Sequence, residues 1–370
     1  MFATATICAP NSTSNCVSVD HLLVDTGSFG LRVLQSEVSS LNLPTVNASN
    51  GSAAYDCVLF GDGSLLWGTV QTATVTLAGE TASNIPIQVI SNSSANLPST
   101  CSNGNPPGDE NTQSTLGANG ILGVGLEPID CGAACDPSGG LASPPFPAYY
   151  TCSSLPCSPA FVTEANQVTN PVVLFPVDNN GVIVELPSVS GSAATVTGSL
   201  IFGIGTEANN QVSSSATVLT LVCDAFTTAF DGQTFGITDT TNCTGPGSFI
   251  DSGSNGLFFP NVPNIPTCPT NTPVGDLSSF YCPTSLQSVS ATNAGTSGAT
   301  KVPNFSVDNA ENLFTASTSS DAAFSTLAGP NLSSAGFDWG LPFFYGINVY
   351  SAIDGQSVPS NLPATPWWAY

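Results

Sequence analysis

The chain has 370 residues, with only two basic side chains, Arg32 and Lys301, against twenty-five Asp and Glu residues, so its formal net charge at pH 7 is −23. A partner rich in phosphate, such as nucleic acid or an anionic membrane surface, requires clustered Lys and Arg, so neither class of partner is expected. The length predicts two domains, because a single hydrophobic core seldom grows beyond about 250 to 300 residues.

The scarcity of charge carries further information. Only 7% of the residues are Asp, Glu, Lys or Arg, whereas about a quarter is usual. Near pH 2 the carboxylates take up protons and only about four positive charges remain, so self-repulsion stays small. The composition therefore favours a protein that works in acid, although an exported acidic protein without such adaptation would share it.

Period-two alternation of apolar and polar residues, punctuated by Gly and Pro, predicts a mainly β fold. Residues 70–77 show the alternation clearly, since Thr72, Thr74 and Thr76 alternate with apolar residues. Short helices are predicted at 31–41 and 309–314. The predicted strands are 21–24, 70–77, 85–90, 172–177, 182–186, 199–203 and 217–222.

Two regions dense in Pro, Ser and Gly predict long loops, one at 126–159 and one at 260–300. No apolar run approaches the roughly 20 residues of a membrane helix, so no membrane span is expected. The first residues do not resemble a signal peptide, and we expect an export signal upstream of residue 1.

Twelve cysteines, an even number, predict disulfides formed in an oxidising compartment. Spacing alone does not fix their connectivity. Pairing of sequence neighbours gives Cys8–Cys16, Cys57–Cys101, Cys131–Cys135, Cys152–Cys157, Cys223–Cys243 and Cys268–Cys282. The alternative is a zinc site built from Cys131, Cys135, Cys152 and Cys157, which their spacing does not favour.

An internal repeat carries the candidate chemistry. The runs HLLVDTGS and GSFIDSGS each end in Asp-(Thr/Ser)-Gly-Ser, with the aspartates at Asp25 and Asp251, and an apolar run follows each turn. One such tripeptide is a common turn, but two copies in equivalent β-rich settings indicate a duplicated structure.

These signatures resemble those of the pepsin-like aspartic proteases, and further segments resemble the same family. The run Phe60-Gly61-Asp62-Gly63-Ser64 resembles the flap hairpin. Two further segments, 119–123 with Gly123 and 339–345 with Gly340, resemble those that close the ψ loop of each lobe. The finer pattern resembles a bacterial pepsin-like group of unassigned function. The resemblance implies a bilobal, mainly β fold with a pseudo-twofold axis and a central cleft.

The resemblance also implies domains and roles. An N-terminal lobe, residues 1–165, would carry Asp25, the flap Phe60, Gly61 and Asp62, and a disulfide-stapled insertion at about 127–160, and a C-terminal lobe, residues 166–370, would carry Asp251. Asp25 and Asp251 would be the catalytic pair that shares one proton between base and acid. Thr26 and Ser252 would link the two loops, Gly27 and Gly253 would permit close approach, and Ser28 and Ser254 would donate to the carboxylates.

Four positions depart from the family pattern. Phe60 stands where the flap usually has Tyr, and Arg32 stands where a Trp usually supports that Tyr. Asn255 follows the second signature where a hydroxyl is typical, and Asp338 lies within the second apolar closing segment. Tyr55 or Trp67 is an alternative flap residue.

Other functions remain as alternatives. Serine and cysteine peptidase chemistry is disfavoured because the only histidine, His21, lies four residues before Asp25 in the same predicted strand. A pepsin-like module that binds a protein, peptide or glycan in the cleft without cleaving it is the main rival, and a structural adhesion protein is a weaker one. Arg32 and Lys301 are expected to pair with carboxylates.

The leading prediction is a secreted, acid-acting aspartic endopeptidase that hydrolyses polypeptides in the cleft. The pair needs no metal and no cofactor, nothing indicates obligate assembly beyond a monomer, and the expected location is extracellular or periplasmic.

Overall fold

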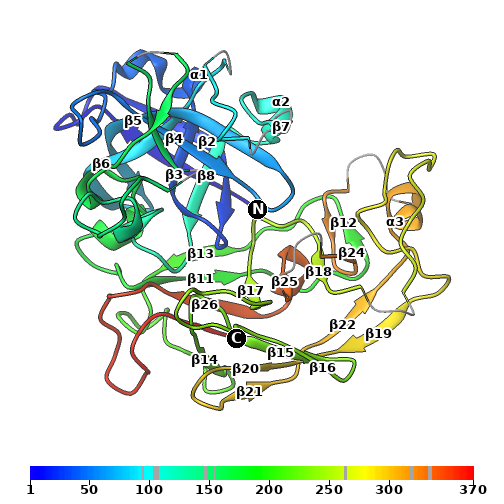
Figure 1. Ribbon diagram of the computed structural model, residues 1–370. Helices are drawn as coiled ribbons and strands as arrows, with labels where there is room; N and C mark the ends of the chain where they lie inside the picture. Colours follow the sequence, from blue (N-terminus) through cyan, green and yellow to red (C-terminus); the bar gives the residue numbers. More distant parts are fainter. Residues whose placement is uncertain are drawn as a thin grey trace. The chain divides into compact units, whose positions relative to one another are not determined.

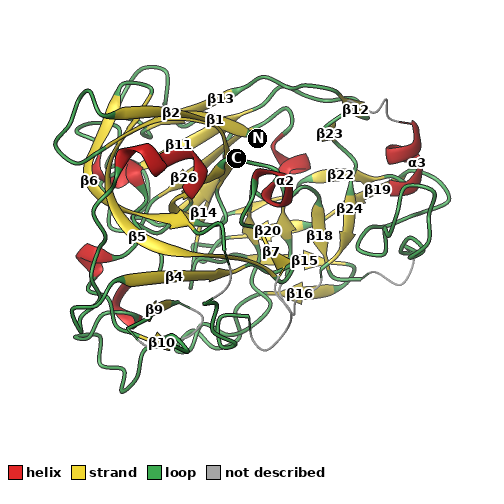
Figure 2. Cartoon of the chain, turned by 90° about the horizontal axis from the view of Figure 1, so that it is seen from above, coloured by secondary structure: helices red, strands yellow, loops and turns green. Residues whose placement is uncertain are grey.

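The computed structural model describes residues 1–93, 96–102, 108–145, 148–153, 155–261, 265–316, 321–331 and 336–370. The chain forms two compact units, Met1–Asn179 and Asn180–Tyr370. Strands dominate in both units, and helices are few and short (Figure 1, Figure 2). The predicted mainly β class is confirmed.

The first unit extends beyond residue 165, where the sequence analysis places the end of the N-terminal lobe. The additional residues stay with this unit because the backbone N–H of Asn170 donates to the carbonyl of Pro128 at 3.0 Å. The expected insertion at 127–160 also lies in this unit. Its residues 146, 147 and 154 fall outside the described part of the chain.

Alternating burial explains the strands. In β5, Val75 and Leu77 are buried, whereas Thr74 and Thr76 beside them are partly exposed, so one face of the strand contributes to the core. The strands of the first unit are β1 (Phe2–Cys8), β2 (Cys16–Asp25), β3 (Phe29–Leu34), β4 (Ala54–Leu59), β5 (Ser64–Leu77), β6 (Glu80–Ile90), β7 (Gly108–Asp109), β8 (Gly120–Val124), β9 (Tyr149–Thr151) and β10 (Ser158–Pro159).

These strands form one sheet in the order β1-β2-β8-β3-β6-β5-β4-β9-β10, with β7 beside β5. Because β1 also pairs with β5, the first six strands of this order form a closed ring. Short helices connect the strands: α1 (Gln35–Val38), α2 (Gln113–Leu116), and the 3₁₀ turns η1 (Ser39–Leu41), η2 (Gly132–Ala134), η3 (Glu164–Asn166) and η4 (Pro171–Leu174).

The second unit contains several smaller sheets, with strand orders β13-β11-β26-β27-β14, β16-β15-β20-β21, β17-β25-β18-β24, β12-β23 and β19-β22. Its helical segments are α3 (Ala310–Ala316) and η5 (Leu341–Phe344). The strands are β11 (Gly181–Glu185), β12 (Ser192–Ala193), β13 (Ser199–Phe202), β14 (Val218–Thr220), β15 (Thr227–Phe230), β16 (Gln233–Phe235), β17 (Phe249–Ile250), β18 (Leu257–Phe259), β19 (Gln287–Ser290), β20 (Thr292–Ala294), β21 (Thr300–Lys301), β22 (Asn304–Val307), β23 (Ala323–Phe324), β24 (Ala328–Pro330), β25 (Asp338–Trp339), β26 (Asn348–Ala352) and β27 (Trp367–Ala369).

Aromatic packing dominates the core around β18 and β25. The rings of Phe259 and Phe337 stack with centroids 5.2 Å apart, and Phe337 stacks on Trp339 at 4.9 Å. All three side chains are at most 1% exposed, so the two strands are held together by buried rings.

Six disulfide bonds staple the chain, and each joins sequence neighbours as expected. The four cysteines considered for zinc are all oxidised, so they cannot form that site. The pairs are Cys8–Cys16, Cys57–Cys101, Cys131–Cys135, Cys152–Cys157, Cys223–Cys243 and Cys268–Cys282.

One predicted element is wrong and one is confirmed in part. Residues 172–177 were expected to form a strand, but η4 forms there because the Asn170 side chain accepts the N–H of Val172 at 3.2 Å and Pro171 occupies the first turn. Residues 31–41 were expected to be helical, and α1 and η1 confirm this for residues 35–41. Residues 31–34 instead continue β3, because that strand pairs with β8 on one side and β6 on the other. No helix in the described residues is long and apolar enough to cross a membrane.

Both units contain the same four-strand arrangement around their Asp-(Thr/Ser)-Gly-Ser turn. In the first unit β2 enters the turn, β3 leaves it, and β8 lies between them, parallel to β2 and antiparallel to β3. In the second unit β25 lies in the same way between β17 and β18. The fourth strand, β6 or β24, runs parallel to the leaving strand. The repeated sequence therefore forms a repeated topology, the ψ arrangement.

Glycine is required where the middle strand passes the turn. A Cβ on Gly123 would lie 2.7 Å from the backbone nitrogen of Phe29, and a Cβ on Gly340 would lie 2.0 Å from the carbonyl oxygen of Gly256. Both obstructing atoms belong to the backbone, which cannot rotate away as a side chain can. These two predicted closing glycines thus allow the strand to pass directly against the turn.

We expect Gly340→Ala to lower the free energy of unfolding by at least about 2 kcal/mol, because the new methyl group overlaps the backbone. The matched control is Gly61→Ala, since no described atom lies within 4 Å of its added Cβ; its stability should change by less than about 0.5 kcal/mol. Chemical denaturation measures both. Equal stability of the two variants would contradict the proposed crowding.

Candidate active site

The Asp25 turn holds its carboxylate with groups from the same signature. Asp25 ends β2 and is 5% exposed. Its Oδ1 accepts the backbone N–H of Gly27 at 2.8 Å, and its Oδ2 accepts the hydroxyl of Ser28 at 2.5 Å. Each oxygen therefore has a donor, and the two hydrogen bonds fix the direction of the carboxylate.

The Asp251 turn repeats this pattern. Asp251 directly follows β17, and its Oδ1 accepts the N–H of Gly253 at 2.7 Å and the N–H of Ser254 at 3.3 Å. Its Oδ2 lies 3.0 Å from the hydroxyl oxygen of Ser254. The two turns thus share a glycine N–H and a serine hydroxyl as donors to the carboxylate, and the second turn adds the N–H of Ser254.

The residues between each aspartate and glycine are buried. Thr26 and Ser252 are each 1% exposed. Thr26 lies against Gly125 of the closing segment, since a Cβ on Gly125 would be 2.6 Å from the Thr26 carbonyl oxygen. The backbone of Thr26, one of the residues predicted to support the aspartate, is therefore packed directly against the closing segment.

The second turn also contacts the carboxyl of Asp338. The Ser254 hydroxyl oxygen lies 2.6 Å from Asp338 Oδ2 as well as 3.0 Å from Asp251 Oδ2. A hydroxyl has one proton to donate, so both contacts are hydrogen bonds only when one of the two carboxyls is protonated. In the strand register the equivalent position of the first unit is Ile121, so this connection exists only at the second turn.

The predicted flap forms the tip of the β4–β5 hairpin. The N–H of Phe60 donates to the Ser64 carbonyl at 2.9 Å, and Asp62 Oδ1 accepts both the N–H and the hydroxyl of Ser64, at 2.9 and 2.7 Å. Gly61 lies within this turn. Phe60 packs on an apolar cluster formed by Leu34, Leu66, Ile90 and Ile121.

The alternative flap residues lie farther from this tip. Tyr55 pairs with Thr69 and Trp67 pairs with Cys57 in the β4–β5 ladder. Their rings stack with centroids 5.2 Å apart and pack on the cluster around the Cys57–Cys101 disulfide. Phe60 is therefore the aromatic residue at the hairpin tip.

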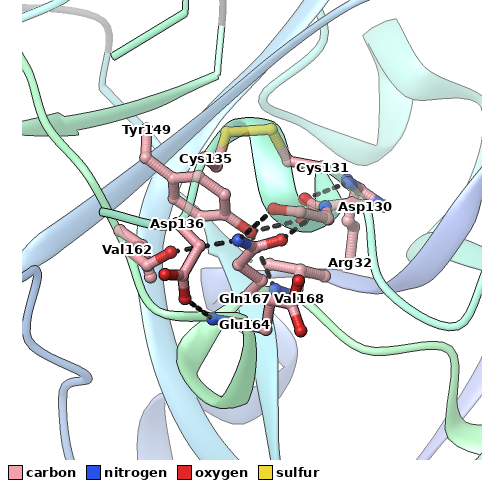
Figure 3. Close-up of a disulfide and its surroundings, with 11 residues drawn as sticks. Arg32, Asp130, Cys131, Cys135, Asp136, Tyr149, Val162, Glu164, Gln167 and Val168 are labelled. Carbon is pink, nitrogen blue, oxygen red and sulfur yellow. Dashed lines mark hydrogen bonds and ion pairs between the residues drawn. A yellow bond between two sulfur atoms is a disulfide. The ribbon is translucent and has the colours of Figure 1, made fainter. Parts of the chain in front are cut away.

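A buried ionic cluster below the first turn was not predicted as a unit. Arg32 Nη2 lies 3.0 Å from Asp130 Oδ2 and 3.6 Å from Asp56 Oδ2. The Tyr149 hydroxyl donates to the other oxygen of Asp130 and accepts the N–H of Val168 at 2.8 Å (Figure 3). The expected pairing of Arg32 with carboxylates is confirmed.

Burial controls the ionisation of this cluster. Desolvation raises the pKa of Asp56 well above its usual range, and the neighbouring charge of Asp130 raises it further. Desolvation also raises the pKa of Asp130 to about 6, although Arg32 opposes that change. One guanidinium with two carboxyls is thus neutral overall when one carboxyl keeps its proton.

Because the folded pKa of Asp130 exceeds its usual value of 3.8, the folded state binds more protons than the unfolded state between about pH 4 and 6. We therefore expect the free energy of unfolding to fall by about 3 kcal/mol from this residue as pH rises through that window. Denaturation at several pH values measures the effect.

Asp130→Asn should flatten this dependence, because it removes the carboxyl that titrates in this window. The control Asp136→Asn removes a partly exposed carboxylate outside the cluster, and it should leave the slope between pH 5 and 7 unchanged. A wild type whose stability rises steadily from pH 4 to 7 would contradict the assignment.

Two other predicted residues have structural roles at the surface. His21 is exposed and its Nδ1 lies 3.1 Å from Asp20 Oδ2, while Asp25 in the same strand is buried. A positive φ of 49° at His21 interrupts the alternation that would place the two side chains on one face. Lys301 was expected to pair with a carboxylate, but its Nζ donates to the carbonyl of Ser215 at 2.9 Å.

The chain is thus a mainly β protein of two units, each with a ψ arrangement that presents one carboxylate. It belongs to the family described as "Protein of unknown function (DUF3443)", whose model matches residues 1–370. No curated protein matches the chain. Among solved structures it is similar to the aspartic proteinase from Irpex lacteus, with a TM-score of 0.49 and 17% sequence identity over 95% of this chain and 93% of that chain.

Proposed function

We propose that the protein is an exported aspartic endopeptidase in which Asp25 and Asp251 act together on a peptide bond at acidic pH. The observation that supports this most strongly is the duplication of a complete carboxylate turn. Both turns have the same donors to each carboxylate, the same ψ strand order and a crowded glycine beneath. An ordinary polar turn that contains an aspartate does not require this combination of donors, strand order and crowded glycine.

The chemistry follows from one proton shared by two carboxyls. The ionised carboxylate accepts a proton from a water molecule as the water oxygen adds to the peptide carbonyl carbon. The protonated carboxyl donates its proton to the carbonyl oxygen. When the carbon–nitrogen bond breaks, the carboxyl that took the water proton donates it to the amine nitrogen, and the other carboxylate takes a proton from a hydroxyl of the tetrahedral intermediate. The pair thus recovers its single proton, and protons and bonds balance without a metal or a covalent intermediate.

Three features support action in acid outside the reducing cytosol. The sequence has only two basic side chains, so a protonated chain repels itself little. The raised pKa values of Asp56 and Asp130 mean that these two residues contribute more to folding stability in acid than at neutral pH. Six disulfides match an oxidising compartment.

The flap residue favours one alternative function. Phe60 has no hydroxyl, so this position offers a peptide an apolar contact and no side-chain hydrogen bond. A protein that only binds a polypeptide through this surface, without cleaving it, does not need a hydroxyl at the position of Phe60. The two functions differ in whether product forms.

The test is hydrolysis of casein and of a peptide library between pH 2 and 7, with and without pepstatin. Asp25→Asn and Asp251→Asn should each lower the rate by about 100-fold or more, because each removes a group that moves a proton in the reaction. Pepstatin should inhibit the wild type.

Asp136→Asn is the matched control. Asp136 Oδ1 also accepts an N–H and a hydroxyl from a following serine, Ser138, at 2.7 and 2.6 Å, but it lies outside any ψ arrangement. This variant should retain wild-type activity. Hydrolysis that survives both active-site substitutions would reject the mechanism, and an inactive wild type that binds polypeptide would favour the binding function.

A further inference from the structure

Arg32 reaches back to the turn that carries Asp25. It lies on β3, and its Nη1 donates to the carbonyl oxygen of Phe29 at 2.5 Å. Phe29 directly follows Ser28, whose hydroxyl donates to Asp25. The guanidinium therefore binds the backbone one residue beyond a group that holds the candidate catalytic carboxylate.

The guanidinium is itself fixed in position. Its side chain is 3% exposed, and Asp130 and Asp56 lie on the side of Nη2, 3.0 and 3.6 Å away. Asp130 is held in turn by the Tyr149 hydroxyl and, through its own N–H, by the carbonyl of Val168 at 3.1 Å (Figure 3). A planar fork with one nitrogen on the turn and one on a buried carboxylate cannot rotate without breaking a contact.

Val168 provides a second link between the cluster and the turn. A Cβ on Gly30, the second residue of β3, would lie 2.5 Å from Val168 Cγ1. The N–H of the same Val168 donates to Tyr149 at 2.8 Å. Displacement of the cluster would therefore also change the packing under the start of β3.

The ψ arrangement does not itself require this cation. In the second unit the position equivalent to Arg32 is Phe258, which pairs with Gly329 as Arg32 pairs with Gln88. Phe258 contacts another ring, Phe280, at a centroid distance of 6.0 Å. The same register position thus holds an apolar residue in the second unit.

Stability does not explain a charged group at this place. Removing a guanidinium and carboxylates from water is costly, and well-packed apolar replacements of buried ion pairs are often neutral or stabilising. Phe258 shows that an apolar residue fits the equivalent position. A role in orienting the turn explains why this position has the guanidinium of Arg32, with donors on two nitrogens, and not an apolar side chain.

We propose that Arg32 is a positioning residue that holds the Phe29 carbonyl, and thereby the orientation of Asp25, against the buried Asp130–Asp56 pair. The inference rests on the proposed function, because the orientation of Asp25 affects catalysis only if Asp25 acts in the reaction. The contacts require two guanidinium nitrogens at once. Lysine would preserve the charge, but its donors all lie on one nitrogen, so it cannot reproduce a fork that reaches the two acceptors from separate nitrogens.

The experiment compares wild type, Arg32→Lys and the control Gln167→Leu. Gln167 is buried, and its side chain bonds the backbone of Gly132 and Val162 near the Cys131–Cys135 disulfide rather than the Asp25 turn. The control therefore lowers stability without altering the turn. Two quantities are measured: kcat and KM for peptide hydrolysis, and amide hydrogen exchange at Gly27 and Gly125, whose N–H groups bond Asp25 and the Ser28 carbonyl.

We expect Arg32→Lys to lower kcat by about 10- to 100-fold with KM within about threefold of wild type, because a misplaced catalytic group affects the transition state more than ground-state binding. Exchange at Gly27 and Gly125 should accelerate by about tenfold or more. Gln167→Leu should change neither kcat nor these two exchange rates.

If a folded Arg32→Lys variant has the same kcat and the same exchange rates as the wild type, the proposal is overturned. Only the positive charge at this position would then matter. If that variant does not fold, Arg32→Met with Asp130→Leu replaces it, since this double change removes both charges. Unchanged exchange at Gly27 in the folded double variant would likewise overturn the proposal. Exchange is independent of turnover, so an inactive wild type would refute the proposed function while the exchange data still decide the role of Arg32.

Discussion

The passage of a middle strand directly beneath an aspartate turn is the constraint on which both units depend. β8 and β25 each pair with the strand that enters the turn and with the strand that leaves it. This pairing fixes both ends of a very short segment, so the carboxylate has little freedom. The same proximity excludes a side chain at Gly123 and Gly340. The sequence signature of each unit therefore includes a distant glycine, Gly123 or Gly340, as well as the Asp-(Thr/Ser)-Gly-Ser turn.

The two turns are supported by different chemistry. Charge lies beneath the first turn, where Arg32 is surrounded by buried carboxyls, whereas rings lie beneath the second, where Phe258 takes the equivalent position. In contrast, the second turn has an additional carboxyl, Asp338, in contact with the Ser254 hydroxyl. A duplicated fold thus gives its two aspartates different surroundings, which is the condition under which two identical acids can take different roles.

Much of the fold and the candidate site could be predicted because the signals are local. The Asp-(Thr/Ser)-Gly-Ser turns, the alternation in residues 70–77 and the closely spaced cysteines each depend on a few adjacent residues. The cluster around Arg32 could not be predicted, because Asp56 and Asp130 are separated by 74 residues and are brought together only by the sheet and the loop after β8. The one available signal was an arginine within an apolar strand in a chain with two basic residues. The strand predicted at residues 172–177 is wrong for a local reason. Asn170 and Pro171 favour a 3₁₀ turn there, although the residues that follow are apolar.

The central claim, that Asp25 and Asp251 act as one pair, is tested most directly by a crystal structure of the protein with pepstatin at acidic pH. The account predicts that the central hydroxyl of the inhibitor contacts both carboxyls, which lie within about 3 Å of each other. A structure in which the inhibitor is bound elsewhere, or in which the two carboxyls occupy separate environments, would contradict it.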